Sequence, residues 1–410
     1  MEHSKLFLYM RRRHRVINVL LALLIAALTS AMLLLAYYSD IFSVGTLNDY
    51  SQPIVATNDV TVFFPAAYPE LIAIYGTARY AATGDSAALA ALYRITSVAL
   101  GEALGTSRET EEISETEFRA ALSRVGLYFD YLYPVPLDSV VAWTGVTSIR
   151  EHDIQARRFI LTPDENGFAL LYYEADGRFY KSETIANLGA VLPRLGEYIS
   201  NSGYFAFEHN IGGIDPYCLF FDALPDIPAL ELSRPLLDAR TILPLLGMNA
   251  YLQAEYSADG FTWLYVEDER QARFLSGGEV KFTRYALTAP ATSLNEAIEI
   301  ARAQVAPFAA GNELLTLRYS GYEFDGTTYR ISFVWYYNEY EIRAPGATVA
   351  VDGTGIREAD IRLLTANPAG TDYAPLLPAP QAAAVATVQT PNAELRLAYD
   401  ETGTPIWLVE

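Results

Sequence analysis

The chain has 410 residues, of which 51% are hydrophobic and 19% charged, and its net charge is −20. The length allows two or three domains, and the hydrophobic content excludes disorder for most of the chain. Phosphate contacts require a basic face, which so acidic a chain lacks, and we therefore expect no nucleic acid among its partners.

The N-terminus predicts a membrane helix. An uncharged apolar run extends from Val16 to Tyr38, and as a helix it would be about 34 Å long, enough to cross a bilayer core of about 30 Å. The tail of residues 1–15 before it holds five basic residues: Lys5, Arg11, Arg12, Arg13 and Arg15. The positive-inside rule then places residues 1–15 in the cytoplasm and the rest of the chain outside.

A cleaved signal peptide is the alternative for this run. Its small-x-small cleavage site could be Thr29-Ser30-Ala31, but the apolar run continues beyond that point. We therefore favour an uncleaved, single-pass anchor in the cell membrane. Five of the 29 basic residues and one of the 49 acidic ones lie in the tail, so the remainder of the chain carries −24.

One stripe of the predicted membrane helix carries small and polar residues. Asn18, Ala22, Ala26 and Ser30 recur every four positions, which places them along one side of the helix. Small-x-x-x-small spacing lets a second helix approach closely in lipid. These four residues are the candidate contact with a partner's membrane helix, although the frequency of alanine in this chain accounts equally well for the pattern.

Residues 39–58 are predicted to be a linker, and residues 59–209 an N-terminal α+β domain. Within that domain we expect a helix from Ala87 to about Leu104, and a second helix capped by Ser114-Glu115-Thr116-Glu117. Strands follow from about Ala156, joined by turns at 164–167 and at Asp176-Gly177. A helix over about 183–200 is expected to end the domain.

Proline and glycine cluster in residues 210–235, which we interpret as the start of a new domain. Residues 210–288 are predicted to be a central β-rich domain containing an antiparallel meander. Residues 289–410 are predicted to be a C-terminal α+β domain whose helix is capped by Ser293-Leu294-Asn295-Glu296. The fold class is therefore α+β: an N-terminal transmembrane helix, then antiparallel sheets with packed helices in two or three extracytoplasmic domains.

Few residues are available for chemistry. The one cysteine, Cys218, lies beside Tyr217 and Leu219-Phe220-Phe221 and is expected to be a buried free thiol; we expect no metal, cofactor or disulfide. Gly84-Asp85-Ser86 resembles a hydrolase motif, yet a helix N-cap explains it better. The glutamates of residues 109–117 lack the ligand spacing of a calcium loop. A glycosidase-type carboxylate pair is not selected by any pattern.

The second half of the chain resembles the YycH/YycI family and also PepSY-type units, a helix followed by a short sheet. The resemblance covers roughly residues 240–410 and the anchor layout, and it departs from the family at Met248-Asn249-Ala250, where an aromatic residue and a proline are usual. The matching segments are Leu246–Asn249, Tyr256–Gly260, Leu264–Glu267, Ala272–Phe274, Gly277–Phe282, Leu294–Ile298, Tyr329–Phe333, Leu397–Tyr399 and Pro405–Val409.

The resemblance implies a function that the residues alone do not. Members of this family are not enzymes; they regulate a sensor histidine kinase of a two-component system that controls cell-wall metabolism. The implied partners are that kinase and a sister regulator in the membrane. Two alternatives stay open: an anchored module that binds cell wall or peptide through its tyrosine-rich sheets, and a hydrolase that depends on carboxylates.

Overall fold

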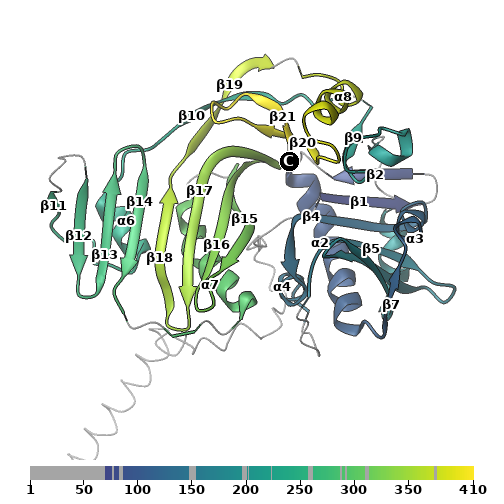
Figure 1. Cartoon of the computed structure of the whole chain (residues 1–410), viewed down its shortest axis with the longest axis horizontal. Helices are drawn as coiled ribbons and strands as arrows, with labels where there is room; N and C mark the ends of the chain where they lie inside the picture. The colour runs from purple at the N-terminus through teal and green to yellow at the C-terminus, as the bar shows by residue number, and fades with distance from the viewer. Residues whose placement is uncertain are drawn as a thin grey trace, which may run out of the picture. The chain divides into compact units, whose positions relative to one another are not determined.

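The structure is a computed structural model, and it is α+β, as the sequence predicts (Figure 1). All the residues it describes belong to one compact unit, Asn58–Glu410. The predicted membrane helix at 16–38 and its stripe Asn18, Ala22, Ala26 and Ser30 lie outside the described residues. The described residues are 70–75, 78–82, 86–146, 154–195, 201, 203–222, 224–256, 262–286, 289–290, 293–309, 314–373 and 376–410.

The first sheet is antiparallel and has seven strands in the order β2-β1-β4-β5-β6-β7-β3. The predicted turns at 164–167 and Asp176-Gly177 are confirmed, because they join β5 to β6 and β6 to β7. The strands are β1 (Glu70–Tyr75), β2 (Ala78–Ala82), β3 (Thr110–Ile113), β4 (Gly126–Pro136), β5 (Gln155–Pro163), β6 (Phe168–Ala175) and β7 (Arg178–Asn187).

Helices cover both faces of this sheet. On one face α2 (Ser86–Thr106) and α4 (Leu137–Trp143) share a core with the sheet, in which Phe129 and Phe159 are fully buried. On the other face α3 (Glu115–Ala121) inserts Phe118 among buried aromatic residues of the strands. The predicted cap of α3 is confirmed, because the Ser114 hydroxyl accepts a hydrogen bond from the Glu117 amide at 3.2 Å.

Within the described residues, one helical stretch, Ala87–Thr106 of α2, is long and apolar enough to cross a membrane. This is weak evidence for a span, because a core helix passes the same test, and more than half of α2 is buried. Leu92 and Leu100 of α2 are fully buried in the core shared with the sheet. The apolar character of α2 is thus accounted for by packing.

The helix predicted over 183–200 is wrong in its first part. Residues up to Asn187 continue strand β7, and two short turns of helix follow in the described part of this range, at Leu188–Ala190 and Leu192–Leu195; residues 196–200 lie outside the described residues. Burial alternates along this stretch: Ser182, Thr184 and Ala186 are buried while the residues between them are exposed. That period of two is the pattern of a strand with one buried face.

The second large sheet has ten strands and extends in the order β11-β12-β13-β14-β18-β17-β16-β15, with β20 pairing in parallel with β17 and β21 pairing with β20. Its strands are β11 (Glu255–Tyr256), β12 (Trp263–Glu267), β13 (Arg270–Leu275), β14 (Glu279–Arg284), β15 (Leu315–Phe324), β16 (Tyr329–Tyr337), β17 (Tyr340–Asp352), β18 (Gly355–Arg362), β20 (Leu395–Tyr399) and β21 (Pro405–Val409).

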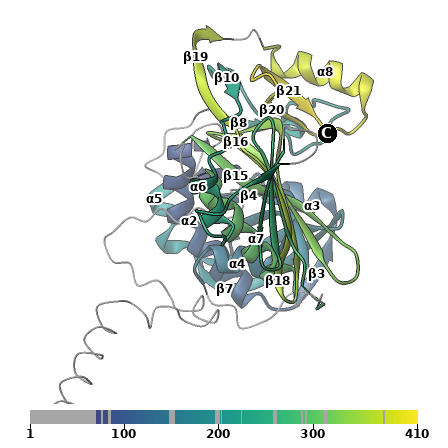
Figure 2. The same cartoon turned by 90° about the vertical axis from the view of Figure 1, so that its left-hand side faces the viewer.

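Helices α6 (Ala239–Leu245) and α7 (Leu294–Ala309) lie on the same side of this sheet (Figure 2). The predicted cap of α7 is confirmed, because the Ser293 hydroxyl accepts a hydrogen bond from the Glu296 amide. Helix α8 (Ala379–Gln389) packs on a separate cluster that includes Cys218 and Leu395. The remaining elements are β8 (Gly203–Phe205), a 3-10 turn (Ala206–His209), β9 (Leu219–Phe221), β10 (Pro228–Ser233) and β19 (Thr365–Tyr373).

Strand pairing crosses both predicted boundaries within the unit Asn58–Glu410. Strand β8, before residue 210, pairs with β9, after it. Strand β14, before residue 289, pairs with β18, after it. The described residues of the proline- and glycine-rich stretch 210–235 include β9 and β10 and therefore lie within one unit, because the hydrogen bonds that complete the sheets come from both sides of each boundary.

Candidate functional site

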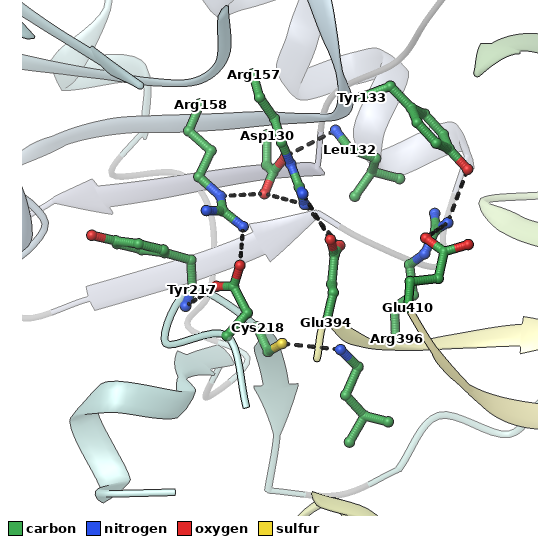
Figure 3. A network of polar contacts seen from close by, with 12 residues as sticks. Asp130, Leu132, Tyr133, Arg157, Arg158, Tyr217, Cys218, Glu394, Arg396 and Glu410 are labelled. Atoms are coloured by element: carbon green, nitrogen blue, oxygen red, sulfur yellow. Dashed lines mark hydrogen bonds and ion pairs between the residues drawn. The ribbon is translucent and has the colours of Figure 1, made fainter. Parts of the chain in front are cut away.

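A polar cleft lies between the seven-stranded sheet and β20 (Figure 3). Three arginines line it and form ion pairs with six carboxylates, of which Asp130, Glu341 and Glu394 also line it; its cavity of about 40 Å³ is room for one or a few water molecules. We call these nine residues the arginine network: Arg157, Arg158, Arg396, Asp130, Glu174, Asp215, Glu341, Glu394 and Glu410.

Strand register brings the centre of the network together. Asp130 of β4 lies directly opposite Arg158 of β5, and Arg158 lies opposite Glu174 of β6. Strand β4 bulges immediately after Asp130, where Leu132 has a φ of 65° and its amide donates to Asp130 Oδ1 at 2.8 Å. The bulge interrupts the pairing of β4 with β5, which resumes at Val135 opposite Ala156, and Asp130 lines the cleft just before this interruption.

In the first part of the network, which we call the Asp130 cluster, two arginines form ion pairs with four carboxylates. The Arg158 guanidinium donates to Asp130 at 3.0 Å, to Glu174 at 2.8 Å and to Asp215 at 2.7 Å. Its neighbour Arg157 donates to Asp130 at 2.8 Å and to Glu394 at 2.7 Å. Since Asp215 and Glu394 lie far along the chain, the cluster ties the first sheet to two later segments.

Burial and pairing compete to set the charge of this cluster. Burial opposes ionisation of Asp130, yet Arg157 and Arg158 together hold the pKa of its carboxyl well below the usual range. For Glu174 the balance is reversed: burial raises the pKa of its carboxyl, although Arg158 opposes the shift. The Asp130 carboxylate is therefore the firmly ionised centre of the cluster, and Glu174 is its more readily protonated member.

Arg396 organises the second part, the Arg396 cluster. Its Nη2 atom lies 2.8 Å from Glu341 Oε2, 2.9 Å from Glu410 Oε2 and 3.1 Å from the Tyr133 hydroxyl. Tyr133 belongs to β4 of the first sheet, and its hydroxyl donates to Glu341 at 3.1 Å. This cluster therefore joins β4 to β17 and β20.

Cys218 lines the same cleft and is buried with its thiol free, which confirms the prediction. Its Sγ accepts a hydrogen bond from the Leu395 amide at 3.2 Å, and burial raises the pKa of the thiol far above its usual range. The residue thus resembles an apolar core side chain more than a nucleophile, because only the thiolate is nucleophilic.

Other residues singled out in the sequence have ordinary surroundings where the structure describes them. Ser86 begins α2, while Gly84 and Asp85 lie outside the described residues. Of the glutamates of residues 109–117, Glu111 and Glu112 lie on β3, and Glu115 and Glu117 lie on α3, where they pair with Arg119 and Lys181. Within the described part of the chain, no three His, Cys, Asp or Glu residues gather as metal ligands would.

The arginine network was not predicted from the sequence, and one signal for it was present. Arg157 and Arg158 stand side by side at the start of an otherwise apolar strand, so one of the two must face each side of the sheet. Comparison with family models, curated proteins and solved structures gave no match.

Proposed function

We propose that the chain is a membrane-anchored extracytoplasmic regulator of a sensor histidine kinase, which it contacts through protein–protein interfaces without catalysing a reaction. The run Val16–Tyr38 and its basic flank support a single-pass anchor with the N-terminus in the cytoplasm. The resemblance to the YycH/YycI family supports the identity of the partner and its two-component system.

The observation that carries a contact role is how the charges of the cleft are used. Every ionisable member of the arginine network has an oppositely charged partner within 3.0 Å. Charged groups engaged with one another in this way hold elements together, whereas a catalytic acid or base must be free to exchange a proton with a substrate. The network therefore favours a protein that binds partners over one that catalyses a reaction.

An anchored module that binds cell wall or peptide is the second candidate, and one feature of the cleft favours it. Opposite the charged residues, the cleft is lined by aromatic and apolar side chains that include Phe220, Tyr340 and Trp407. Aromatic rings beside polar groups suit a peptide or a sugar. The cavity of about 40 Å³ argues against this reading, because it is smaller than ordinary ligand pockets.

Purification of the tagged full-length chain from membranes of its own cells tests the proposal. A histidine kinase that copurifies in stoichiometric amount supports regulation; wall fragments without a kinase support the second candidate and overturn the first. As a matched pair of variants, Ala22→Leu with Ala26→Leu should weaken kinase recovery, and Leu20→Ile with Leu24→Ile should not. If equal amounts of kinase copurify with both variants, the stripe Asn18, Ala22, Ala26 and Ser30 does not contact the kinase, and the contact is made by the rest of the chain.

A further inference from the structure

The Arg396 guanidinium distributes its hydrogen bonds unevenly. Its Nη2 atom has two hydrogens and three acceptors within 3.1 Å: Glu341, Glu410 and the Tyr133 hydroxyl. Its Nε, in contrast, is buried and has no hydrogen-bond partner among the described residues. Arg396 is only 8% exposed, so one donor atom is overused and another is unused inside the protein.

A second arginine nearby provides the reference case. Arg318 of β15 and Glu339, which lies in the turn between β16 and β17, form a bidentate pair at 2.8 and 2.9 Å. Both side chains are under 10% exposed, so this pair is as buried as Arg396 and Glu341. Both of these hydrogen bonds go to a single carboxylate, that of Glu339.

In the Arg396 cluster one cation meets two carboxylates. Their oxygens Glu341 Oε2 and Glu410 Oε2 both accept from the same nitrogen, so the two acids share one cation. Two carboxylates that share a site cannot both ionise at little cost, and the more buried one is expected to take up a proton first. Glu341 is that one, because its side chain is 7% exposed and that of Glu410 is 39% exposed.

We infer that Glu341 and Glu410 form a proton-binding pair on Arg396, and that proton uptake strengthens the junction between β4, β17 and β20 as the surroundings become mildly acidic. The inference concerns the chain itself and holds whichever partner it binds. When Glu341 is neutral, Glu410 becomes the single counter-ion of Arg396, as Glu339 is of Arg318.

The groups facing Glu341 agree with this assignment. Burial raises the pKa of the Glu341 carboxyl, although Arg396 opposes the shift. Burial also raises the pKa of the hydroxyl of Tyr336 to about 12, so this phenol stays neutral in mild acid and in mild base. The charged or titratable groups around Glu341 are Arg396 and Glu410 from the β20–β21 side, Tyr133 from β4, and Tyr336 from β16, over whose ring Arg318 of β15 lies.

Thermal unfolding of the full chain in detergent, followed by circular dichroism from about pH 7.5 to about pH 5, tests the inference with two isosteric variants. The sign follows from linkage: a folded-state pKa above the unfolded value makes the stability contribution grow as pH falls through the folded pKa. Glu341→Gln imitates the protonated acid, so its melting temperature at about pH 7.5 should equal or exceed that of the wild type. The difference in melting temperature between Glu341→Gln and the wild type should vanish at about pH 5.

Glu339→Gln is the matched control, because it removes a carboxylate of equal burial from a one-to-one pair. This variant should melt several degrees lower than the wild type at both pH values. If Glu341→Gln is destabilised as much as Glu339→Gln at about pH 7.5, Glu341 is an ordinary ion-pair partner and the inference is overturned.

Glu410→Gln supplies an independent test at a more exposed position, where a failure to fold is not expected. With Glu410 neutral, Arg396 and Glu341 become a one-to-one pair, so Glu341 should stay ionised into more acidic solution. The gain in melting temperature between about pH 7.5 and about pH 5 should then be smaller than in the wild type. If Glu410→Gln gains as much in melting temperature as the wild type, the protonation of Glu341 does not depend on Glu410, and the inference is overturned.

Discussion

Two of the contacts that join the two large sheets use different chemistry. At the α4–α7 contact, the Ser139 hydroxyl donates to Asn295 at 2.6 Å and the Trp143 indole donates to Glu299 at 2.7 Å. At the cleft, the arginine network joins the same two sheets through ion pairs. Donors that do not titrate make the first contact, whereas the second depends on the protonation of its acids.

Because of this difference, one part of the free energy of unfolding should be independent of pH, and another part, from the arginine network, should depend on pH. The Ser139 hydroxyl and the Asn295 amide do not titrate, so this pair of the α4–α7 contact should contribute the same free energy from acid to base. The arginine network buries more carboxylates than arginines, and such charges are costly unless they are paired or protonated. Breaking each contact in turn should therefore give different dependences on pH.

The largest effect is expected from Arg158→Met. Methionine keeps much of the side-chain volume but leaves Glu174 and Asp215 without their cation, and Asp130 with Arg157 alone. Removing one partner of a buried ion pair costs about 3–5 kcal/mol of unfolding free energy, which urea unfolding would measure.

Arg178→Met is the control for this change, because Arg178 is 58% exposed and its partner Glu112 is 60% exposed. Exposed pairs contribute about 0–1 kcal/mol. A loss from Arg158→Met as small as that of the control would mean that the network does not hold the sheets together.

Asp130→Asn should produce the next largest loss, and the loss should depend on pH. Arg157 and Arg158 keep the pKa of Asp130 low, so its ionised form contributes stability above about pH 4 that disappears as the pH falls further. The difference in unfolding free energy between wild type and variant should therefore narrow in acid. Asp268→Asn, in the exposed turn between β12 and β13, is the control and should show a small difference in unfolding free energy.

The sequence predicted the local parts of this fold and missed the network. Caps at Ser114 and Ser293 and the turn at Asp176-Gly177 depend on neighbouring residues, so their signals lie within a few positions. The network depends on pairs such as Arg157 with Glu394, which are 237 positions apart. Such a pair becomes visible only after the strand order is known, since register brings the partners together.

The error at residues 183–187 has a related cause. Those residues continue β7 because β6 offers them a pairing partner and α2 covers one face, both of which are tertiary features. The alternation of Ser182, Thr184 and Ala186 with exposed residues was present in the sequence, but small and polar residues make the period of two faint.

Trp143→Phe should cost less than either change in the network. The variant loses the indole hydrogen bond to Glu299, a charged acceptor, which is worth about 1.5–3 kcal/mol. Glu299→Gln keeps an acceptor in place and should cost less. If Trp143→Phe is as stable as the wild type, the indole contributes only apolar area to the α4–α7 contact.

The smallest effect, and the sharpest test of the comparison, comes from the hydroxyl–amide pair. Ser139 is fully buried, and its hydroxyl lies 2.6 Å from Asn295 Oδ1. A double-mutant cycle of Ser139→Ala and Asn295→Ala should give a coupling of about 0.5–1.5 kcal/mol. Neither group titrates, so the coupling should be the same at about pH 7.5 and about pH 5, and it should not change with added salt. If the coupling becomes smaller in acid or in salt, the Ser139–Asn295 pair depends on nearby charges as the arginine network does. The proposed difference between a contact that is independent of pH and one that depends on pH would then be wrong.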